Sequence, residues 1–175
     1  MSLIYEPAED SYLMQEVLEK ELLNKNIKIL EIGCGSGILL EVLKKLGINN
    51  ILGADINGGA VKHCKGLGFD CIYSDLFSNI KEKFDIIIFN PPYLPEDKNN
   101  KEDRESKLAT TGGKKGSEII NRFLQQAKKH LTKDGKIFLL TSSLTKNINW
   151  LDYKKKLIAK KKLFFEELMV WEIKV

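Results

Sequence analysis

The tetrapeptide Asn90-Pro91-Pro92-Tyr93 directly follows an apolar run at residues 84–89, which is typical of a buried strand. The side-chain oxygen of Asn90 and the backbone carbonyl of Pro91 are two acceptors that can bind one planar NH2 group. Two prolines keep these acceptors stiff, and the Tyr93 ring can stack on a flat amide or base. The motif can thus hold an amino nitrogen in line with an alkyl donor, without a general base. Alone, it could equally be a turn that ends a strand.

A second candidate motif is a glycine-rich turn in which Gly33, Gly35 and Gly37 lie between a short buried strand and a helical pattern. Missing side chains there let a ligand approach the backbone and the helix N-terminus. A dinucleotide fingerprint would need its third glycine at the position of Ile38, so nicotinamide cofactors are disfavoured. With Glu31 two residues ahead, the turn instead resembles the loop that binds S-adenosylmethionine. A tight strand-to-helix connection could have the same composition.

Two acidic residues end the next two expected strands. Asp55 lies where a carboxylate can accept hydrogen bonds from both hydroxyls of a ribose. Asp75 lies where a carboxylate can accept a hydrogen bond from the adenine amino group, and the apolar Ile56 and Leu76 can cover the faces of the adenine ring. Either aspartate alone could be a turn or a helix cap. Both of them after the glycine turn, together with Asn90 as a contact of cofactor and substrate, predict a methyl-transfer enzyme that uses S-adenosyl-L-methionine.

The elements that must position these residues alternate between strands and helices, which predicts a parallel sheet with helices on both faces. An amphipathic helix over residues 8–23 comes first. Expected strands cover residues 27–31, 51–55, 70–74, 84–89 and 136–141, and expected helices cover residues 37–46, 58–65 and 118–130, the last capped by Ser117. A long polar loop spans residues 94–115. A lysine-rich helix is predicted over residues 148–161, followed by strands at residues 163–165 and 168–175 that are too close for a parallel crossover and form an antiparallel hairpin.

The pattern as a whole is α/β, with a seven-stranded, mostly parallel sheet that ends in an antiparallel hairpin. This is the architecture of the Rossmann-like class I methyltransferases. The length of 175 residues and the 43% hydrophobic content suit a single domain over residues 1–175. Lys and Arg exceed Asp and Glu by only 28 − 24 = 4, which does not by itself indicate a nucleic-acid partner.

The three cysteines, Cys34, Cys64 and Cys71, include no Cys-x-x-Cys pair, so the sequence predicts neither a disulfide framework nor a zinc site. His63 and His130 are far apart in the chain, and no metal is predicted. The N-terminus lacks the features of a secretory signal, and no run of about 18 apolar residues occurs. We therefore expect a soluble protein of the reducing cytoplasm, with no membrane partner.

Over nearly its whole length the chain resembles the HemK-like glutamine methyltransferases, and more closely their short eukaryotic and archaeal branch. Besides the motifs above, two segments carry the resemblance: Tyr5-Glu6-Pro7-Ala8-Glu9-Asp10-Ser11, and Gly112-Gly113-Lys114-Lys115-Gly116-Ser117-Glu118 followed by Ile119, Ile120, Arg122 and Phe123. The resemblance implies that the first covers the cofactor, with Asp10 and Ser11 near its methionine end, and that the second borders the substrate pocket. Taken alone, they would be a helix start with acidic residues and a flexible loop that enters a helix.

This resemblance also implies partners. The acceptor would be the glutamine amide in the Gly-Gly-Gln motif of a class I translation release factor, and some members of the branch also methylate lysine. Bacterial relatives carry an extra N-terminal helical domain that holds the release factor; without it, recognition is expected from loops or a partner. A small zinc-binding activator subunit is expected at the outer strand of the sheet, residues 69–73, because an apolar edge strand is a liability unless it is covered.

Two other functions are compatible with the sequence. A DNA or RNA methyltransferase acting on adenine N6 or cytosine N4 presents the same planar NH2 group to the same tetrapeptide. Its basic surface would have to come from Lys154, Lys155, Lys156, Lys160, Lys161 and Lys162, which we interpret as a solvated helix face. A non-catalytic, methyltransferase-like binding protein is the second alternative, and the intact motifs argue against it.

Overall fold

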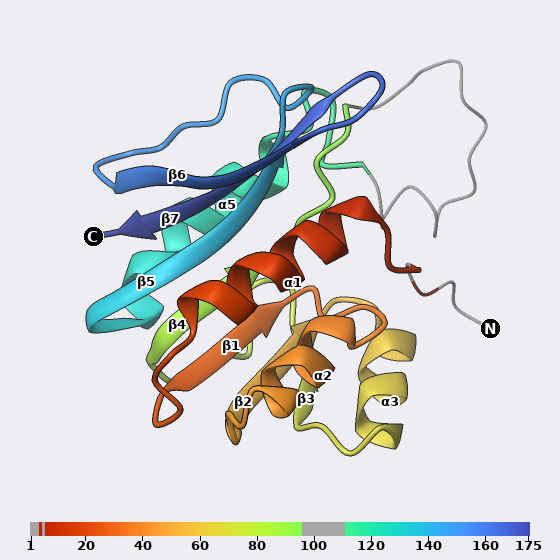
Figure 1. Ribbon diagram of the computed structural model, residues 1–175, viewed down its shortest axis with the longest axis vertical. Helices are drawn as coiled ribbons and strands as arrows, with labels where there is room; N and C mark the ends of the chain where they lie inside the picture. The colour runs from red at the N-terminus through yellow and green to blue at the C-terminus, as the bar shows by residue number, and fades with distance from the viewer. Residues whose placement is uncertain (1–3, 5, 96–110) are drawn as a thin grey trace.

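The computed structural model describes residues 4, 6–95 and 111–175, which surround one seven-stranded sheet with the strand order β3-β2-β1-β4-β5-β7-β6 (Figure 1). The strands are β1 (Lys28–Ile32), β2 (Asn50–Asp55), β3 (Cys71–Tyr73), β4 (Phe84–Phe89), β5 (Leu131–Ser142), β6 (Lys154–Lys162) and β7 (Glu167–Lys174). The helices are α1 (Glu9–Glu21), α2 (Ile38–Lys45), α3 (Gly58–Gly66), α5 (Glu118–Ala127) and the short 3-10 helix η1 (Lys128–His130). The predicted fold class is confirmed.

Five neighbouring strands, from β3 to β5, run parallel, and β7 joins them antiparallel to β5 and β6. Helices cover both faces of the sheet, so its central strands are buried on both sides and read as continuous apolar runs. Because successive side chains on a strand point to opposite faces, Ile86 and Ile88 of β4 pack beneath α1 and α2, whereas Ile87 and Phe89 pack against α5. Figure 1 shows α1, α2 and α3 in front of the sheet and α5 behind it.

The lysine-rich segment was predicted wrongly. It forms the edge strand β6, not a helix, and the hairpin consists of β6 and β7 joined by residues 163–166, so the predicted strand at residues 163–165 is the turn. Lysine, leucine and alanine favour helices locally, but pairing with β7 along the whole strand overrides that preference. Lys155 lies over the rings of Trp150 and Trp171, at 4.2 and 4.8 Å from their centroids. Lysines on an exposed edge also prevent pairing with another sheet.

Smaller differences concern the ends of elements. Strand β5 begins five residues earlier than expected, at Leu131, and α5 gives way to the 3-10 turn at Lys128. Ser117 precedes α5 as predicted, but its side chain makes no capping hydrogen bond; the Glu118 carboxylate accepts one from the Lys115 N–H at 3.1 Å. Most of the predicted loop at residues 94–115 lies outside the described residues. Within the described part of the chain, no helix has the length and apolarity needed to cross a membrane.

Candidate active site

The carboxyl ends of three adjacent strands bring the predicted motifs together. Ile32 of β1 pairs with Ala54 of β2 on one side and with Phe89 of β4 on the other. The residues that follow in register are therefore Gly33, Asp55 and Asn90, which meet at one edge of the sheet. A cavity of about 500 Å³ opens there. Its lining includes the predicted site residues Asp10, Ser11, Glu31, Gly33, Gly35, Asp55, Ile56, Asp75, Leu76, Asn90, Pro91, Pro92 and Tyr93.

The glycine turn is tied to the second strand by the Asp55 carboxylate. One oxygen of Asp55 accepts a hydrogen bond from the Gly35 N–H and the other from the Asn57 N–H, each at 2.8 Å. Gly35 has φ +49° and Gly33 has φ +71°, a region that favours glycine. Burial raises the pKa of Asp55, and the backbone hydrogen bonds oppose that rise. The carboxylate is thus held at the cavity wall with lone pairs left to accept hydroxyl groups.

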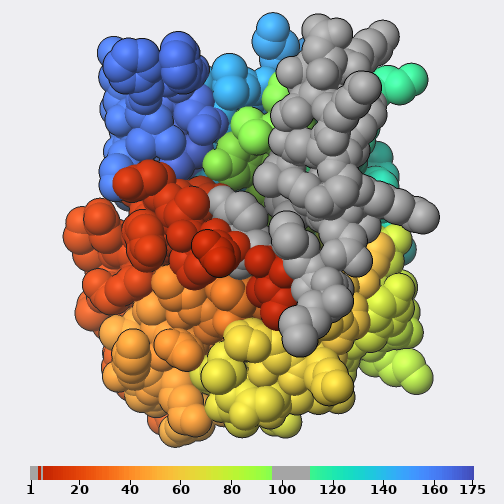
Figure 2. All heavy atoms as spheres, turned by 90° about the vertical axis from the view of Figure 1, so that its right-hand side faces the viewer, coloured from red at the N-terminus to blue at the C-terminus, as the bar shows by residue number. Residues whose placement is uncertain are grey.

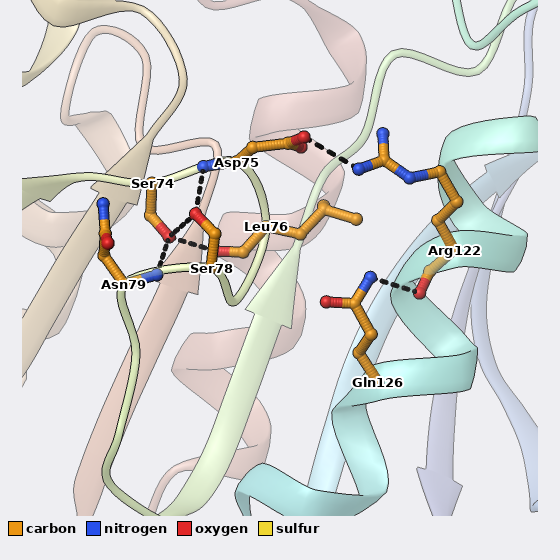
Figure 3. Close-up of polar contacts among 7 residues, drawn as sticks. All are labelled: Ser74, Asp75, Leu76, Ser78, Asn79, Arg122 and Gln126. Carbon is orange, nitrogen blue, oxygen red and sulfur yellow. Dashed lines mark hydrogen bonds and ion pairs between the residues drawn. The ribbon is translucent and has the colours of Figure 1, made fainter.

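The turn after β3 presents Asp75 and Leu76 to the cavity, and Figure 3 shows how it is held. The Ser74 hydroxyl donates to the Leu76 carbonyl at 2.8 Å and accepts from the Asn79 N–H at 3.1 Å. Leu76 has φ +49°, which costs a residue with a Cβ roughly 1–2 kcal/mol. The Ser74 bonds hold the turn in that conformation, which buries the Leu76 side chain at the cavity wall.

The Asn90-Pro91-Pro92-Tyr93 turn is supported by the segment before α5. A Cβ on Gly112 would lie 2.5 Å from the Pro92 carbonyl oxygen, and one on Gly116 would lie 2.3 Å from the Tyr93 carbonyl oxygen. Only glycine permits such a close approach of two backbones. The Tyr93 carbonyl also accepts a hydrogen bond from the Thr145 hydroxyl at 3.0 Å. The segment that the family resemblance places beside the substrate pocket thus lies against the candidate catalytic turn.

Two residues of the cavity lining each carry a buried acceptor atom that has no hydrogen-bond partner among the described residues: Oε2 of Glu31 and Oδ1 of Asn90. Buried polar atoms are normally hydrogen-bonded, so both are expected to meet a donor from a bound molecule. Burial raises the pKa of Glu31 well above its usual range, and the nearby Cys71 and Asp55 raise it further. A cationic ligand with N–H groups would satisfy Glu31, and an NH2 group would satisfy Asn90.

The N-terminal part of α1 closes the cavity from a distant part of the sequence. Asp10 and Ser11 are both buried and line the cavity, and Asp10 accepts hydrogen bonds from the Ser11 N–H at 2.6 Å and from its hydroxyl at 3.3 Å. Figure 2 views the side toward which β1 points and shows this end of the chain between the β6–β7 hairpin and α3. Tyr5, the first residue of the predicted opening segment, lies outside the described residues.

Gly37 is the predicted site residue that the cavity lining does not include. It has φ +82° where α2 begins, and a Cβ there would lie 3.1 Å from the Cys64 sulfur. The need for glycine at this position is therefore explained by the start of α2 and by packing against α3.

Sequence reasoning missed several supporting residues. Thr145 is separated by 52 positions from the Tyr93 carbonyl it binds, and no local pattern links them. Asn57 lines the cavity, and its side chain accepts from the Gly59 N–H at 2.8 Å at the start of α3; an asparagine before Gly-Gly is a detectable capping signal. Arg122 of α5 lines the cavity, in agreement with the resemblance that places its segment beside the substrate pocket, but its ion pair with Asp75 was not predicted.

A mostly parallel sheet with this order, a glycine turn after the first strand and acidic residues at or just after the ends of the next two strands define the class: a Rossmann-like methyltransferase. The sequence profile of the methyltransferase small domain family matches residues 9–158. A candidate protein N5-glutamine methyltransferase of Methanocaldococcus jannaschii is 42% identical, over 95% of this chain and 89% of that protein. The eRF1 methyltransferase catalytic subunit mtq2 of Schizosaccharomyces pombe is 30% identical, over 82% of this chain and 74% of that protein.

Structural comparison agrees with the sequence. The solved Mtq2–Trm112 complex of E. cuniculi, described as responsible for the methylation of the termination factor eRF1, contains a chain with a TM-score of 0.78 at 25% identity, with 97% of each chain covered. The present chain belongs to the methyltransferase small domain family, on the HemK-like branch that includes these relatives.

Proposed function

We propose that this protein transfers the methyl group of S-adenosylmethionine to the side-chain amide of a glutamine, in the Gly-Gly-Gln motif of a class I translation release factor. The observation that carries the proposal is the buried, unpartnered Oδ1 of Asn90 at the end of β4. The names of the relatives, protein N5-glutamine methyltransferase and eRF1 methyltransferase, favour this acceptor. A substrate of this kind places the protein in the cytoplasm, where translation takes place.

In this proposal, Asn90 Oδ1 and the Pro91 carbonyl accept the two N–H groups of the glutamine amide. The lone pair of an amide nitrogen is delocalised into its carbonyl, so orientation is the main contribution that the enzyme can make. The acceptors are fixed before the substrate arrives, because Pro91 and Pro92 restrict the backbone and Thr145 holds the Tyr93 carbonyl. As positive charge develops on the nitrogen, the two acceptors stabilise it and guide the departing proton toward solvent.

The residues present fit S-adenosylmethionine, which supplies an electrophilic methyl group on a sulfonium when it is bound. We assign Glu31 and Asp10 to its positively charged amino-acid end, since both are buried acidic residues of the cavity wall. Asp55 would accept the ribose hydroxyls, and Asp75 would accept the adenine amino group. The Ile56 and Leu76 side chains line the cavity beside these carboxylates, where they can cover the adenine faces.

An activator subunit is proposed at the exposed edge of β3. The Asp70 carbonyl and the Ser74 N–H bond to β2, so the backbone groups of Cys71 and Tyr73 between them point away from the sheet. Tyr73 is 57% exposed. The Tyr73 carbonyl accepts a hydrogen bond from the Asn79 side chain at 2.8 Å, so a strand from a small partner would add through the outward N–H groups of Cys71 and Tyr73 and the Cys71 carbonyl. The solved Mtq2–Trm112 complex of E. cuniculi supports a partner of this kind.

This edge can be tested with two substitutions at one position. Tyr73→Pro removes an outward N–H that a partner strand would bind and leaves the bonds to β2 in place, whereas Tyr73→Ala removes only the side chain. Co-purification with a Trm112-like protein should be lost in Tyr73→Pro and retained, though weaker, in Tyr73→Ala. Equal capture of wild type and Tyr73→Pro would show that the partner does not add a strand to β3.

The deciding experiment for the reaction is methyl transfer from radiolabelled S-adenosylmethionine to a purified class I release factor. The factor is supplied as wild type and with its Gly-Gly-Gln glutamine changed to alanine, with and without the activator candidate. Duplex DNA and RNA are parallel substrates, because a nucleobase amino group fits the same two acceptors. Label on the wild-type factor that is absent from the alanine factor supports the proposal. Label on nucleic acid alone would replace it with the base-methylating alternative, and transfer to lysine would appear as label that survives in the alanine factor.

A further inference from the structure

The sulfur atoms of Cys34, Cys64 and Cys71 all lie within 4.8 Å of one another. The three cysteines come from three different elements: the glycine turn after β1, helix α3 and strand β3. The sequence spacing predicts no such group, because the fold alone brings them together. All three thiols are reduced and buried.

The surrounding backbone is shaped around these sulfur atoms. A Cβ on Gly53 would lie 2.7 Å from the Cys71 sulfur, and one on Gly37 would lie 3.1 Å from the Cys64 sulfur. The Cys64 thiol donates to the Gly35 carbonyl at 3.5 Å. The proposed methyl transfer assigns no chemical role to these thiols.

We propose that Cys34, Cys64 and Cys71 form a three-coordinate binding site for Cu(I), and that the three thiols release their protons to solvent as the ion binds. Three thiolates at about 2.3 Å from a central ion are about 4.0 Å apart, which the observed sulfur separations accommodate. Thiolates are soft ligands that select soft ions, Cu(I) among them. Zinc prefers four ligands, and in the described part of the chain the group contains only these three.

An ion would approach the group from the large cavity, whose lining includes Cys34, although only 3% of that residue is exposed. Once bound, the ion would tie the glycine turn to α3 and β3, which are otherwise linked to it by hydrogen bonds and apolar contacts. The site would then stiffen the turn on which cofactor binding depends.

The test is an anaerobic titration of the full chain with Cu(I) in competition with bicinchoninate, without thiol reductants. Wild type should withhold one equivalent of Cu(I) from the chelator, and X-ray absorption should show three sulfur neighbours at roughly 2.3 Å. Cys71→Ala and Cys64→Ala should each weaken binding at least tenfold. His63→Gln is the matched control, because His63 is an exposed possible ligand next to Cys64 and its loss should change nothing.

The absorption measurement uses the wild type, so the proposal stays testable if a cysteine variant fails to fold. A parallel titration with Zn(II) against a zinc indicator separates the two ions. No withheld Cu(I), a nitrogen neighbour in the absorption spectrum, loss of binding in His63→Gln, or tighter binding of Zn(II) than of Cu(I) would each overturn the assignment.

Discussion

Nη2 of Arg122 lies 2.8 Å from Oδ2 of Asp75, which links helix α5 to the turn after β3 at the cavity (Figure 3). Asp75 is the residue proposed to accept the adenine amino group, so one of its oxygens is already held by Arg122. In that proposal the second oxygen is oriented for the cofactor, and Arg122 is a positioning residue that acts through Asp75.

Arg122→Ala should raise the dissociation constant for S-adenosylmethionine about three- to tenfold, because Asp75 loses the group that orients it. Both side chains are about half exposed, so the free energy of unfolding should change by less than about 1 kcal/mol. Lys128→Ala is the control, since it breaks the exposed ion pair with Asp152, which lies outside the cavity lining. Calorimetric titration with the cofactor measures the dissociation constant of each variant. Wild-type affinity in Arg122→Ala would mean that the ion pair is only a surface contact.

Asn90→Ala should reduce turnover about a hundredfold to a thousandfold, the loss expected when one preorganised polar group at the reacting atom is removed. Cofactor affinity should stay within a few-fold of wild type. Stability should not fall, because the substitution removes a buried acceptor without a partner. Asp55→Ala gives the opposite pattern: it weakens cofactor binding first, as its carboxylate holds Gly35 and Asn57. If Asn90→Ala kept most of its single-turnover rate, the proposed role of Asn90 would be wrong.

Glu31 makes the stability of the protein depend on pH. Its folded pKa lies above the unfolded value of about 4.3, so its contribution is fully present below that pH and is lost as the pH rises through the folded pKa. Glu31→Gln should remove the part of the pH-dependent loss of stability that Glu31 causes. The difference between wild type and variant isolates Glu31, because Asp55, whose pKa is also raised, is present in both. Urea unfolding between pH 4 and 8 measures the free energy of unfolding of both proteins. The same pH dependence in wild type and variant would contradict the assignment.

Glu31 should also couple cofactor binding to proton release. A cationic ligand favours the carboxylate form and lowers the pKa of Glu31. Binding then releases a proton, and the affinity rises with pH across the folded pKa of Glu31. Calorimetry in two buffers with different ionisation enthalpies counts the protons. Wild type should release more protons than Glu31→Gln; identical release would place the positive charge of the cofactor elsewhere.

The residues that line the cavity could be predicted because their signals are local. Gly33, Gly35, Asp55 and Asn90 each lie at or just after the end of a strand that reads clearly in the sequence, and parallel strands bring their carboxyl ends together. The β6 strand could not be predicted, since its stability comes from pairing with β7 and from Lys155 on Trp150 and Trp171. Groups of residues that lie far apart in the sequence could not be predicted for the same reason. Neither the Asp75–Arg122 pair nor the three-cysteine group has any spacing pattern, because only the folded sheet makes its members neighbours.

Gly116 provides a test of how tightly the candidate catalytic turn is supported. Gly116→Ala places a Cβ 2.3 Å from the Tyr93 carbonyl oxygen at φ +80°, so the turn or the segment before α5 must move. Gly47→Ala is the matched control, because Gly47 has φ +82° and nothing within 4 Å of an added Cβ. Both variants carry the left-handed strain of roughly 1–2 kcal/mol, but only Gly116→Ala crowds the site. We expect Gly47→Ala to lose stability and keep its turnover, and Gly116→Ala to lose more stability and at least tenfold in turnover. Equal turnover of the two variants, measured at saturating cofactor, would show that the position of Tyr93 does not limit the reaction.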